Sequence, residues 1–133
     1  MEAMIHIEPV GTVCRSSDGR CLLQVRPQFQ PALDGLKAGG DIQVLYWMHE
    51  LTEEHRRMLK VHPRGDRSRP LRGVFALRSP MRPNPIGVSV VRIHEVQGCE
   101  VAVSDLDAMD GSPLIDVKAA PAQGRRSGVS GES

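Results

Sequence analysis

Short runs of apolar residues, or of apolar residues alternating with polar ones, recur along the chain between turn-forming residues. These runs cover residues 5–13, 21–25, 42–49, 73–77, 86–96, 100–106 and 113–117. Several short strands at this spacing are typical of an all-β sandwich or barrel. The letters QGCE at 97–100 place a glycine between two of the runs and predict a hairpin turn. The pattern therefore predicts an all-β fold.

Three segments depart from this pattern. ELTEEHRRMLK at 50–60 contains helix-forming residues with a partial apolar stripe, which predicts one short helical segment. HPRGDRSRPLRG at 62–73 is basic and interrupted by Gly and Pro, which indicates a loop. Residues 119–133 are small or polar apart from arginines and one valine, so they cannot bury enough apolar surface to fold. We expect a folded domain over 1–118 and a disordered polar tail over 119–133.

Length and composition restrict the class of protein. A chain of 133 residues favours a single domain. No apolar run approaches the ~20 residues of a membrane helix, and the N-terminus lacks the features of a signal peptide, so we expect a cytoplasmic protein. The three cysteines are odd in number and lack C-x-x-C spacing, which indicates neither a disulfide framework nor a zinc site.

Charge is distributed unevenly along the chain. Nine of the 17 Lys and Arg residues lie between Arg56 and Arg82, with Asp66 as the one acid among them. From Glu95 to Asp116 the chain carries six acids and no Lys or Arg. This polarity predicts a basic face for phosphate groups and an acidic face elsewhere. The alternative is a solvated loop whose arginines keep the protein soluble.

The letters RSPMRPNPIG at 78–87 form a loop with three prolines. Each proline fixes its own φ, and each residue before a proline is pushed toward extended backbone. The loop is therefore stiff, and it can hold Arg78, Arg82 and Asn84 in place without losing entropy when a ligand binds. The alternative is a stiff connector that sets the register of the next strand.

Familiar catalytic and metal-binding motifs are absent or incomplete. HELTEEH at 49–55 has Glu53 where a metalloprotease motif needs its second histidine. DLDAMDG at 105–111 has Met109 where a calcium loop needs an oxygen ligand. No glycine-rich phosphate loop of the Walker or dinucleotide type is present. From the residues alone, the rigid loop at 78–87 and the acidic turn at 105–113 remain as candidates for a site.

Three longer sequence segments resemble those of a known family. RGVFALRSPMRPNPIGVSVV at 72–91, DLDAMDGSPLIDVK at 105–118 and VLYWMHE at 44–50 are similar to the TsaA-like family. That family includes the TrmO-type methyltransferases, which act on N6-threonylcarbamoyladenosine beside the tRNA anticodon. The resemblance covers most of residues 5–118. It implies a single-sheeted antiparallel β-barrel, a homodimer, and S-adenosylmethionine bound by loops near the dimer interface, while the missing metal motifs lead us to expect no metal.

The resemblance also implies roles for individual residues. The cofactor-binding positions are Pro27, Gln28, His49, Glu50, Arg78, Val88, Leu106, Asp107, Ala108 and Met109. Arg78 would pair with the cofactor carboxylate, and Asp107 or Asp110 would accept hydrogen bonds from its ribose or ammonium. As catalytic residues, Asp110 or Asn84 would orient the acceptor N–H. Phosphates of the tRNA would contact Arg64, Arg67, Arg69, Arg72 and Arg82.

Two other functions stay open. Longer family members carry an additional C-terminal segment, so a shorter member could be a methyltransferase for a small molecule or another RNA. The second alternative is a non-catalytic RNA-binding β-barrel, although four aromatic residues are few for stacking on nucleic acid.

Overall fold

The computed structural model describes residues 3–121. The chain divides into two compact units. The sheet unit comprises the described residues up to Trp47 together with Gly87–Ala120, and the loop unit comprises Met48–Ile86 and Pro121.

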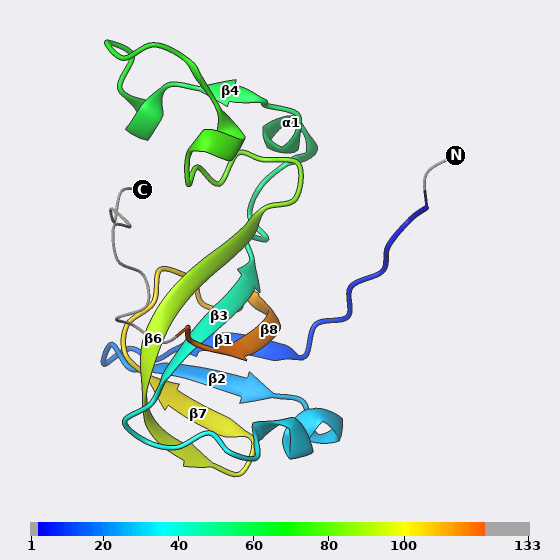
Figure 1. Cartoon of the computed structure of the whole chain (residues 1–133), viewed down its shortest axis with the longest axis vertical. Coiled ribbons are helices and arrows are strands. Elements are labelled where there is room, and N and C mark those ends of the chain that lie inside the picture. Colours follow the sequence, from blue (N-terminus) through cyan, green and yellow to red (C-terminus); the bar gives the residue numbers. More distant parts are fainter. Residues whose placement is uncertain (1–2, 122–133) are drawn as a thin grey trace. The chain divides into compact units, whose positions relative to one another are not determined.

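Six antiparallel strands form the sheet unit (Figure 1). They are β1 (Gly11–Arg15), β2 (Cys21–Val25), β3 (Asp41–Trp47), β6 (Ile86–Gln97), β7 (Glu100–Val103) and β8 (Pro113–Ala119). Their order is β1-β2-β7-β6-β3-β8, and pairing of β8 with β1 closes the sheet into a barrel. The first residue of β6, Ile86, belongs to the loop unit. The prediction of a mostly β protein built on one antiparallel sheet is confirmed.

The interior of the sheet unit is filled by aliphatic side chains from all six strands. Those at most 4% exposed include Val13, Leu23, Ile42, Val44, Val91, Ile93, Val101, Val103 and Leu114. Buried and more exposed residues alternate along β1, β2 and β3, as expected of strands with one face on a core. Burial of these apolar surfaces is the main force that holds the sheet closed.

The predicted hairpin at 97–100 is present. Gln97 pairs with Glu100 across the end of β6 and β7, so Gly98 and Cys99 form a two-residue loop. Gly98 has a φ of 62°, a left-handed conformation that costs glycine little because it has no Cβ. A seven-residue 3₁₀ helix, η1 (Pro27–Leu33), follows β2.

The loop unit has little regular structure. Its elements are α1 (Glu53–Arg56), β4 (Lys60–Val61), η2 (Pro63–Gly65), β5 (Arg72–Gly73) and η3 (Val74–Ala76). Strands β4 and β5 pair with each other in a separate two-stranded sheet. Few side chains of this unit are buried, among them Val74 and Pro85.

The predicted helix at 50–60 was too long. A capping box between Thr52 and His55 begins α1, which ends at Arg56. Met58 and Leu59 are 38% and 62% exposed, so the partial stripe has no core against which to pack. Pairing of Lys60 with Gly73 then draws the chain into β4.

The predicted strand at 73–77 was wrong beyond Gly73. After β5 the chain turns into η3, where the Val74 carbonyl accepts a hydrogen bond from Leu77 N at 3.1 Å. The Arg82 guanidinium donates to the same carbonyl at 3.0 Å. These bonds hold the Val74 carbonyl in the turn instead of in a strand ladder.

Three strand predictions overran their ends, among them the run 42–49, since β3 ends at Trp47. In the predicted run 5–13, β1 begins only at Gly11, whose partner Val25 is the last residue of β2; Ile5 and Ile7 are 84% and 50% exposed. In the run 100–106, β7 ends at Val103.

The end of β8 bears on the expected domain boundary. The strand runs to Ala119, where the tail was expected to begin, and residues 122–133 of the expected tail lie outside the described residues. Among residues 3–121, no helix is long and apolar enough to cross a membrane.

Candidate functional site

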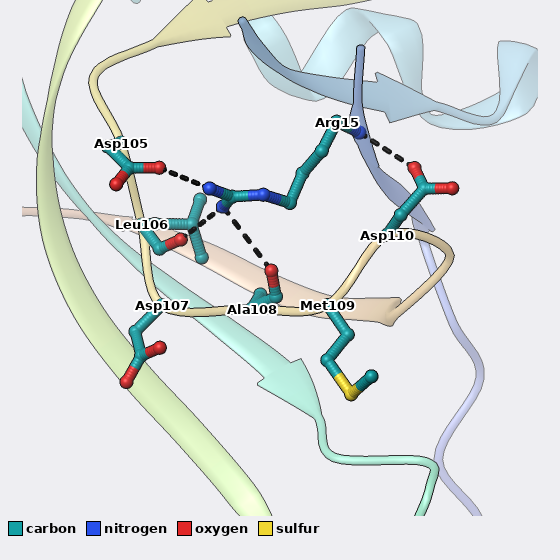
Figure 2. A pocket seen from close by; sticks show the side chains of 7 residues that line it. All are labelled: Arg15, Asp105, Leu106, Asp107, Ala108, Met109 and Asp110. Carbon is teal, nitrogen blue, oxygen red and sulfur yellow. Dashed lines mark hydrogen bonds and ion pairs between the residues drawn. The ribbon is translucent and has the colours of Figure 1, made fainter. Parts of the chain in front are cut away.

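Arg15, at the end of β1, organises the acidic turn that follows β7 (Figure 2). Its Nη2 donates to Asp105 Oδ1 at 2.6 Å. Its Nη1 donates to the carbonyls of Leu106 and Ala108, the latter at 3.3 Å. Its backbone N–H donates to Asp110 Oδ1 at 2.7 Å. One residue therefore ties down both ends of the turn, which we call the acidic loop (residues 105–111).

Two further side chains hold the remaining carbonyls of the acidic loop. The Tyr46 hydroxyl, from β3, donates to Asp107 O at 2.6 Å. The Ser112 hydroxyl donates to Met109 O at 2.7 Å, and the residue is 1% exposed. The carbonyls of residues 106–109 thus all accept hydrogen bonds from side chains, so the backbone of the acidic loop is fixed.

Local strand geometry brings Tyr46 to this position. The register of β3 with β8 shifts between Leu45 and Tyr46, and such a bulge re-aims the side chains beside it. Tyr46 is only 5% exposed. A Cβ on Gly87 of β6 would lie 2.4 Å from the Tyr46 ring, so glycine is required there for the ring to pack.

The three aspartates of the acidic loop differ in their partners. Asp105 is paired with Arg15, and this hydrogen bond raises the pKa of the guanidinium, which stays charged. Asp110 accepts the Arg15 N–H. Within residues 3–121 the exposed Asp107 carboxylate makes no hydrogen bond or ion pair.

A pocket of ≈ 660 Å³ lies at the acidic loop and is lined by Arg15 and residues 105–110 (Figure 2). Leu106 and Ala108 point into the protein and are 3% and 8% exposed, whereas Met109 is 56% exposed. The pocket therefore offers an available carboxylate and an apolar side chain on a rigid backbone. Within the described part of the chain, no group of three His, Cys, Asp or Glu residues is arranged to hold a metal ion.

The structure brings together the predicted residues Leu106, Asp107, Ala108, Met109 and Asp110 in this pocket. Other predicted residues of the sheet unit do not line it. Pro27 and Gln28 begin η1 and are exposed. Val88 lies on β6 and is 37% exposed.

The proline-rich loop at 78–87 is held by internal hydrogen bonds in the loop unit. The Arg82 guanidinium donates to the carbonyls of Leu77 at 3.3 Å, Ser79 at 2.8 Å and Val74 at 3.0 Å. Arg56 Nε donates to Pro83 O at 2.9 Å. Arg82 therefore fastens the loop to η3, a role that the sequence did not indicate.

Four other predicted residues of the loop unit are exposed. Asn84 precedes the buried Pro85, and its backbone carbonyl accepts a hydrogen bond from Ile86 N at 2.7 Å. His49 and Glu50 lie in the turn after β3, with His49 Nε2 3.7 Å from Glu50 Oε2. Arg78 is exposed on the proline-rich loop.

The segment from β4 to β5 carries exposed, unpaired cations. Within residues 3–121, no ion pair engages the side chains of Lys60, Arg64, Arg67, Arg69 or Arg72. The one acid of the segment, Asp66, accepts hydrogen bonds from Ser68, which lower the pKa of its carboxyl group. We call residues 60–73 the basic segment.

Sequence reasoning missed Arg15, Tyr46, Gly87 and Ser112. Each has an ordinary place in a strand or turn, and its role depends on a partner far along the chain. In the sequence, the three aspartates of DLDAMDG are the one feature that points to a cation such as Arg15 beside this turn.

The chain is thus a small antiparallel β protein that carries a fixed acidic loop and a basic segment. Residues 10–122 match the family model of the tRNA-methyltransferase O N-terminal domain. The chain belongs to this family, which confirms the resemblance seen in its sequence.

Individual relatives agree with this assignment. A probable S-adenosyl-L-methionine-binding protein of Methanocaldococcus jannaschii is 45% identical over 86% of this chain and 91% of its own length. One of the same description from Pyrococcus horikoshii is 40% identical over 86% of this chain and 82% of its own length. The crystal structure of TrmO from Pseudomonas aeruginosa has a TM-score of 0.66 and 27% identity, covering 90% of this chain. The match spans only 56% of that structure's chain.

Proposed function

We propose that the protein is an S-adenosylmethionine-dependent methyltransferase that methylates N6 of threonylcarbamoyladenosine beside the tRNA anticodon. The observation that carries this proposal is the Asp107 carboxylate, which has no hydrogen-bond partner within residues 3–121 although its loop is fixed by Tyr46 and Arg15. Family membership and the names of the relatives support the cofactor and the tRNA substrate. A tRNA substrate would place the protein in the cytoplasm.

The chemistry of the acidic loop fits the proposed cofactor. S-adenosylmethionine carries ribose hydroxyls and an ammonium group that donate hydrogen bonds, which the Asp107 carboxylate accepts. Exposed Met109 offers apolar contact for the adenine. Because the loop is already ordered, binding costs little conformational entropy. Pro27, Gln28, His49, Glu50, Arg78 and Val88 stay in the proposed cofactor set as the resemblance gives them.

When bound, the cofactor supplies a methyl group on a positively charged sulfur. Asp110 is the proposed base because the Arg15 N–H holds one of its oxygens at 2.7 Å, which leaves the other to accept the proton of the acceptor nitrogen. Asn84, on the stiff loop, is the proposed alternative for orienting that N–H. Positioning of the acceptor would supply much of the rate.

The basic segment is the proposed contact for tRNA phosphates. Its unpaired arginines are exposed, and arginine binds phosphate through two parallel hydrogen bonds. Such contacts fix orientation and do not read sequence. Arg82, to which the resemblance gives the same role, already donates three hydrogen bonds within its own unit, so we assign it chiefly to stiffening the loop.

The first experiment measures cofactor binding by calorimetry with S-adenosylmethionine and its demethylated product. Asp107→Asn should weaken binding at least tenfold, since hydrogen bonds to a charged group contribute about 1.5–3 kcal/mol. Asp34→Asn removes an exposed carboxylate that does not line the pocket, and it should bind like the wild type. Equal affinity in Asp107→Asn would contradict the proposed site.

The second experiment follows transfer of a labelled methyl group to tRNA with and without the threonylcarbamoyl group. Methylation of modified tRNA alone is expected. Arg67→Ala and Arg69→Ala should weaken tRNA binding and spare cofactor binding, whereas Arg78→Ala should abolish cofactor binding. Turnover on a small molecule without tRNA would favour the first alternative, and RNA binding without cofactor affinity would favour a non-catalytic module.

We also propose a homodimer, as the resemblance implies. The outward positions Val88 and Val90 of β6 are 37% and 55% exposed, and apolar strand residues of this kind are common where subunits meet. Light scattering after gel filtration should give twice the monomer mass, and Val90→Asp should lower it. A monomeric wild type at micromolar concentration would argue against this assembly.

A further inference from the structure

The most exposed aromatic side chain of the described chain lies next to the basic segment. Phe75, in η3, is 82% exposed. Its neighbour Val74 is 2% exposed and donates its N–H to Leu59 O at 2.9 Å. Val74 therefore anchors the turn, and Phe75 is presented to solvent from a fixed backbone.

Other exposed apolar residues belong to the same short ladder. Leu59 precedes β4 and is 62% exposed, and Leu71 precedes β5 and is 54% exposed. The pairing of Lys60 with Gly73 and of Val61 with Arg72 holds these two segments side by side. Contiguous exposed apolar residues often mark a contact surface.

The backbone that carries Phe75 is fixed from a second direction. Arg82 donates to Val74 O and Leu77 O, on either side of the turn. An aromatic ring on a stiff support loses little entropy when a partner covers it.

The charges around Phe75 indicate which partner it meets. The basic segment next to it carries five cations against one carboxylate, and within residues 3–121 none of the five is in an ion pair. A second copy of this chain would bring like charges together, which is unfavourable. Four of the five cations are arginines, whose planar groups suit phosphates and bases better than the point charge of lysine does.

We propose that Phe75 is a stacking platform for an unpaired base of the RNA substrate, with the basic segment holding the phosphates beside that base. This inference rests on the proposed tRNA substrate and adds the residue that contacts a base. Bases stack on aromatic side chains in single-stranded regions and loops of RNA. The anticodon loop, where the proposed reaction takes place, is such a region.

The test uses a synthetic anticodon stem-loop RNA that carries fluorescent 2-aminopurine in its loop. Phe75→Ala should weaken binding on the order of tenfold, because stacking on one base contributes about 1–3 kcal/mol. It should leave unchanged the slope of log affinity against log salt, which reports phosphate contacts. Arg67→Ala should reduce that slope. Phe75→Trp should retain affinity and quench 2-aminopurine, whereas Phe75→Leu should not restore binding.

Ile5→Ala is the matched control, because Ile5 is apolar and 84% exposed but lies outside the basic segment. It should bind RNA like the wild type. Unchanged RNA affinity in Phe75→Ala, or full rescue by Phe75→Leu, would overturn the stacking role. A lower mass of Phe75→Ala in solution would assign the residue to a subunit interface instead, and Phe75-dependent binding to anionic phosphatidylglycerol vesicles would assign it to a membrane surface.

Failure of this inference is distinct from failure of the proposed function. If the wild type methylates the modified tRNA and Phe75→Ala does so with unchanged affinity, only the stacking role is lost. If the wild type neither binds the stem-loop nor methylates tRNA, the tRNA assignment falls, and the stacking role falls with it. Thermal unfolding of each variant should match the wild type, because Phe75 is exposed.

Discussion

The acidic loop and the basic segment are both polar, but they are ordered by different means. The acidic loop is held by side chains from other strands, since Arg15 and Tyr46 reach it across 91 and 61 residues of sequence. The basic segment and the proline-rich loop are held mainly by residues closer in the sequence, such as Arg82 with Ser79 and Asp66 with Ser68, although Arg56 binds Pro83 across 27 residues. The order of the acidic loop therefore depends on the closed sheet, whereas the order of the other two segments depends mainly on residues close to them in the sequence.

The two regions also differ in what they leave exposed. In the acidic loop, hydrogen bonds occupy the carbonyls of residues 106–109, and within residues 3–121 the Asp107 carboxylate makes no hydrogen bond or ion pair. In the basic segment, by contrast, no cation forms an ion pair with any residue of 3–121. A small ligand with hydroxyl and ammonium groups fits the first region, and a polyanion fits the second. Substitutions that affect one region should therefore have little effect on the chemistry of the other.

The largest effect is expected from Gly87→Ala, which would place a methyl group 2.4 Å from the buried Tyr46 ring. Overpacking of this kind costs about 1–3 kcal/mol, and displacement of Tyr46 should also weaken cofactor binding. Gly73→Ala is the matched control in the loop unit, where the nearest atom to the new Cβ is 3.9 Å away. Urea unfolding of both variants checks this, and equal destabilisation would show that the close approach at Gly87 is not a constraint.

Tyr46→Phe should have a smaller effect, because it keeps the ring and removes the hydrogen bond to Asp107 O. Loss of one such bond costs about 0.5–1.5 kcal/mol. Hydrogen exchange in the acidic loop should become faster, and affinity for S-adenosylmethionine should fall several-fold. An unchanged exchange rate would mean that Arg15 and Ser112 alone hold the loop.

Arg15→Lys keeps the charge but loses the planar fork that reaches Asp105 and two carbonyls. A lysine cannot make these bonds together, so cofactor affinity should fall a few-fold while global stability changes little. Arg20→Lys, at an exposed arginine just before β2, should have no effect. Calorimetry on the two variants separates loop positioning from simple charge.

The smallest effect concerns pH and the buried Cys21, where burial raises the pKa of the thiol above its usual value of 9.0. The folded state therefore disfavours the thiolate. Below pH 9.0 the thiol is protonated in both states, and as pH rises through that value ionisation of the unfolded chain lowers the free energy of unfolding. Cys21→Ala should lose less stability than the wild type between pH 8 and about 10 in urea unfolding. Identical losses would rule out Cys21 as a contributor.

Period-two alternation, the hairpin glycine and the proline-rich loop were all readable from the sequence, because each depends on residues within a few positions of one another. Most strands and the hairpin at 97–100 were predicted on that basis, and the family followed from the letters of 72–91 and 105–118. The ends of elements were less accurate. The helix predicted at 50–60 shortened to Glu53–Arg56 because packing and pairing, absent from local sequence, decide where an element stops.

Only the tertiary structure decided how the acidic loop is built and which side chains remain exposed. Closure of the sheet brings Arg15, Tyr46 and Gly87 from three strands to one loop, and no spacing in the sequence relates them. The exposure of Phe75 beside buried Val74 likewise depends on Arg82 and Leu59, which bind the backbone on both sides. The sequence by itself determined the strands, the stiffness of the proline-rich loop and the sign of charge in each region. Three-dimensional hydrogen bonding determined which of those charges are satisfied internally and which remain available to a ligand.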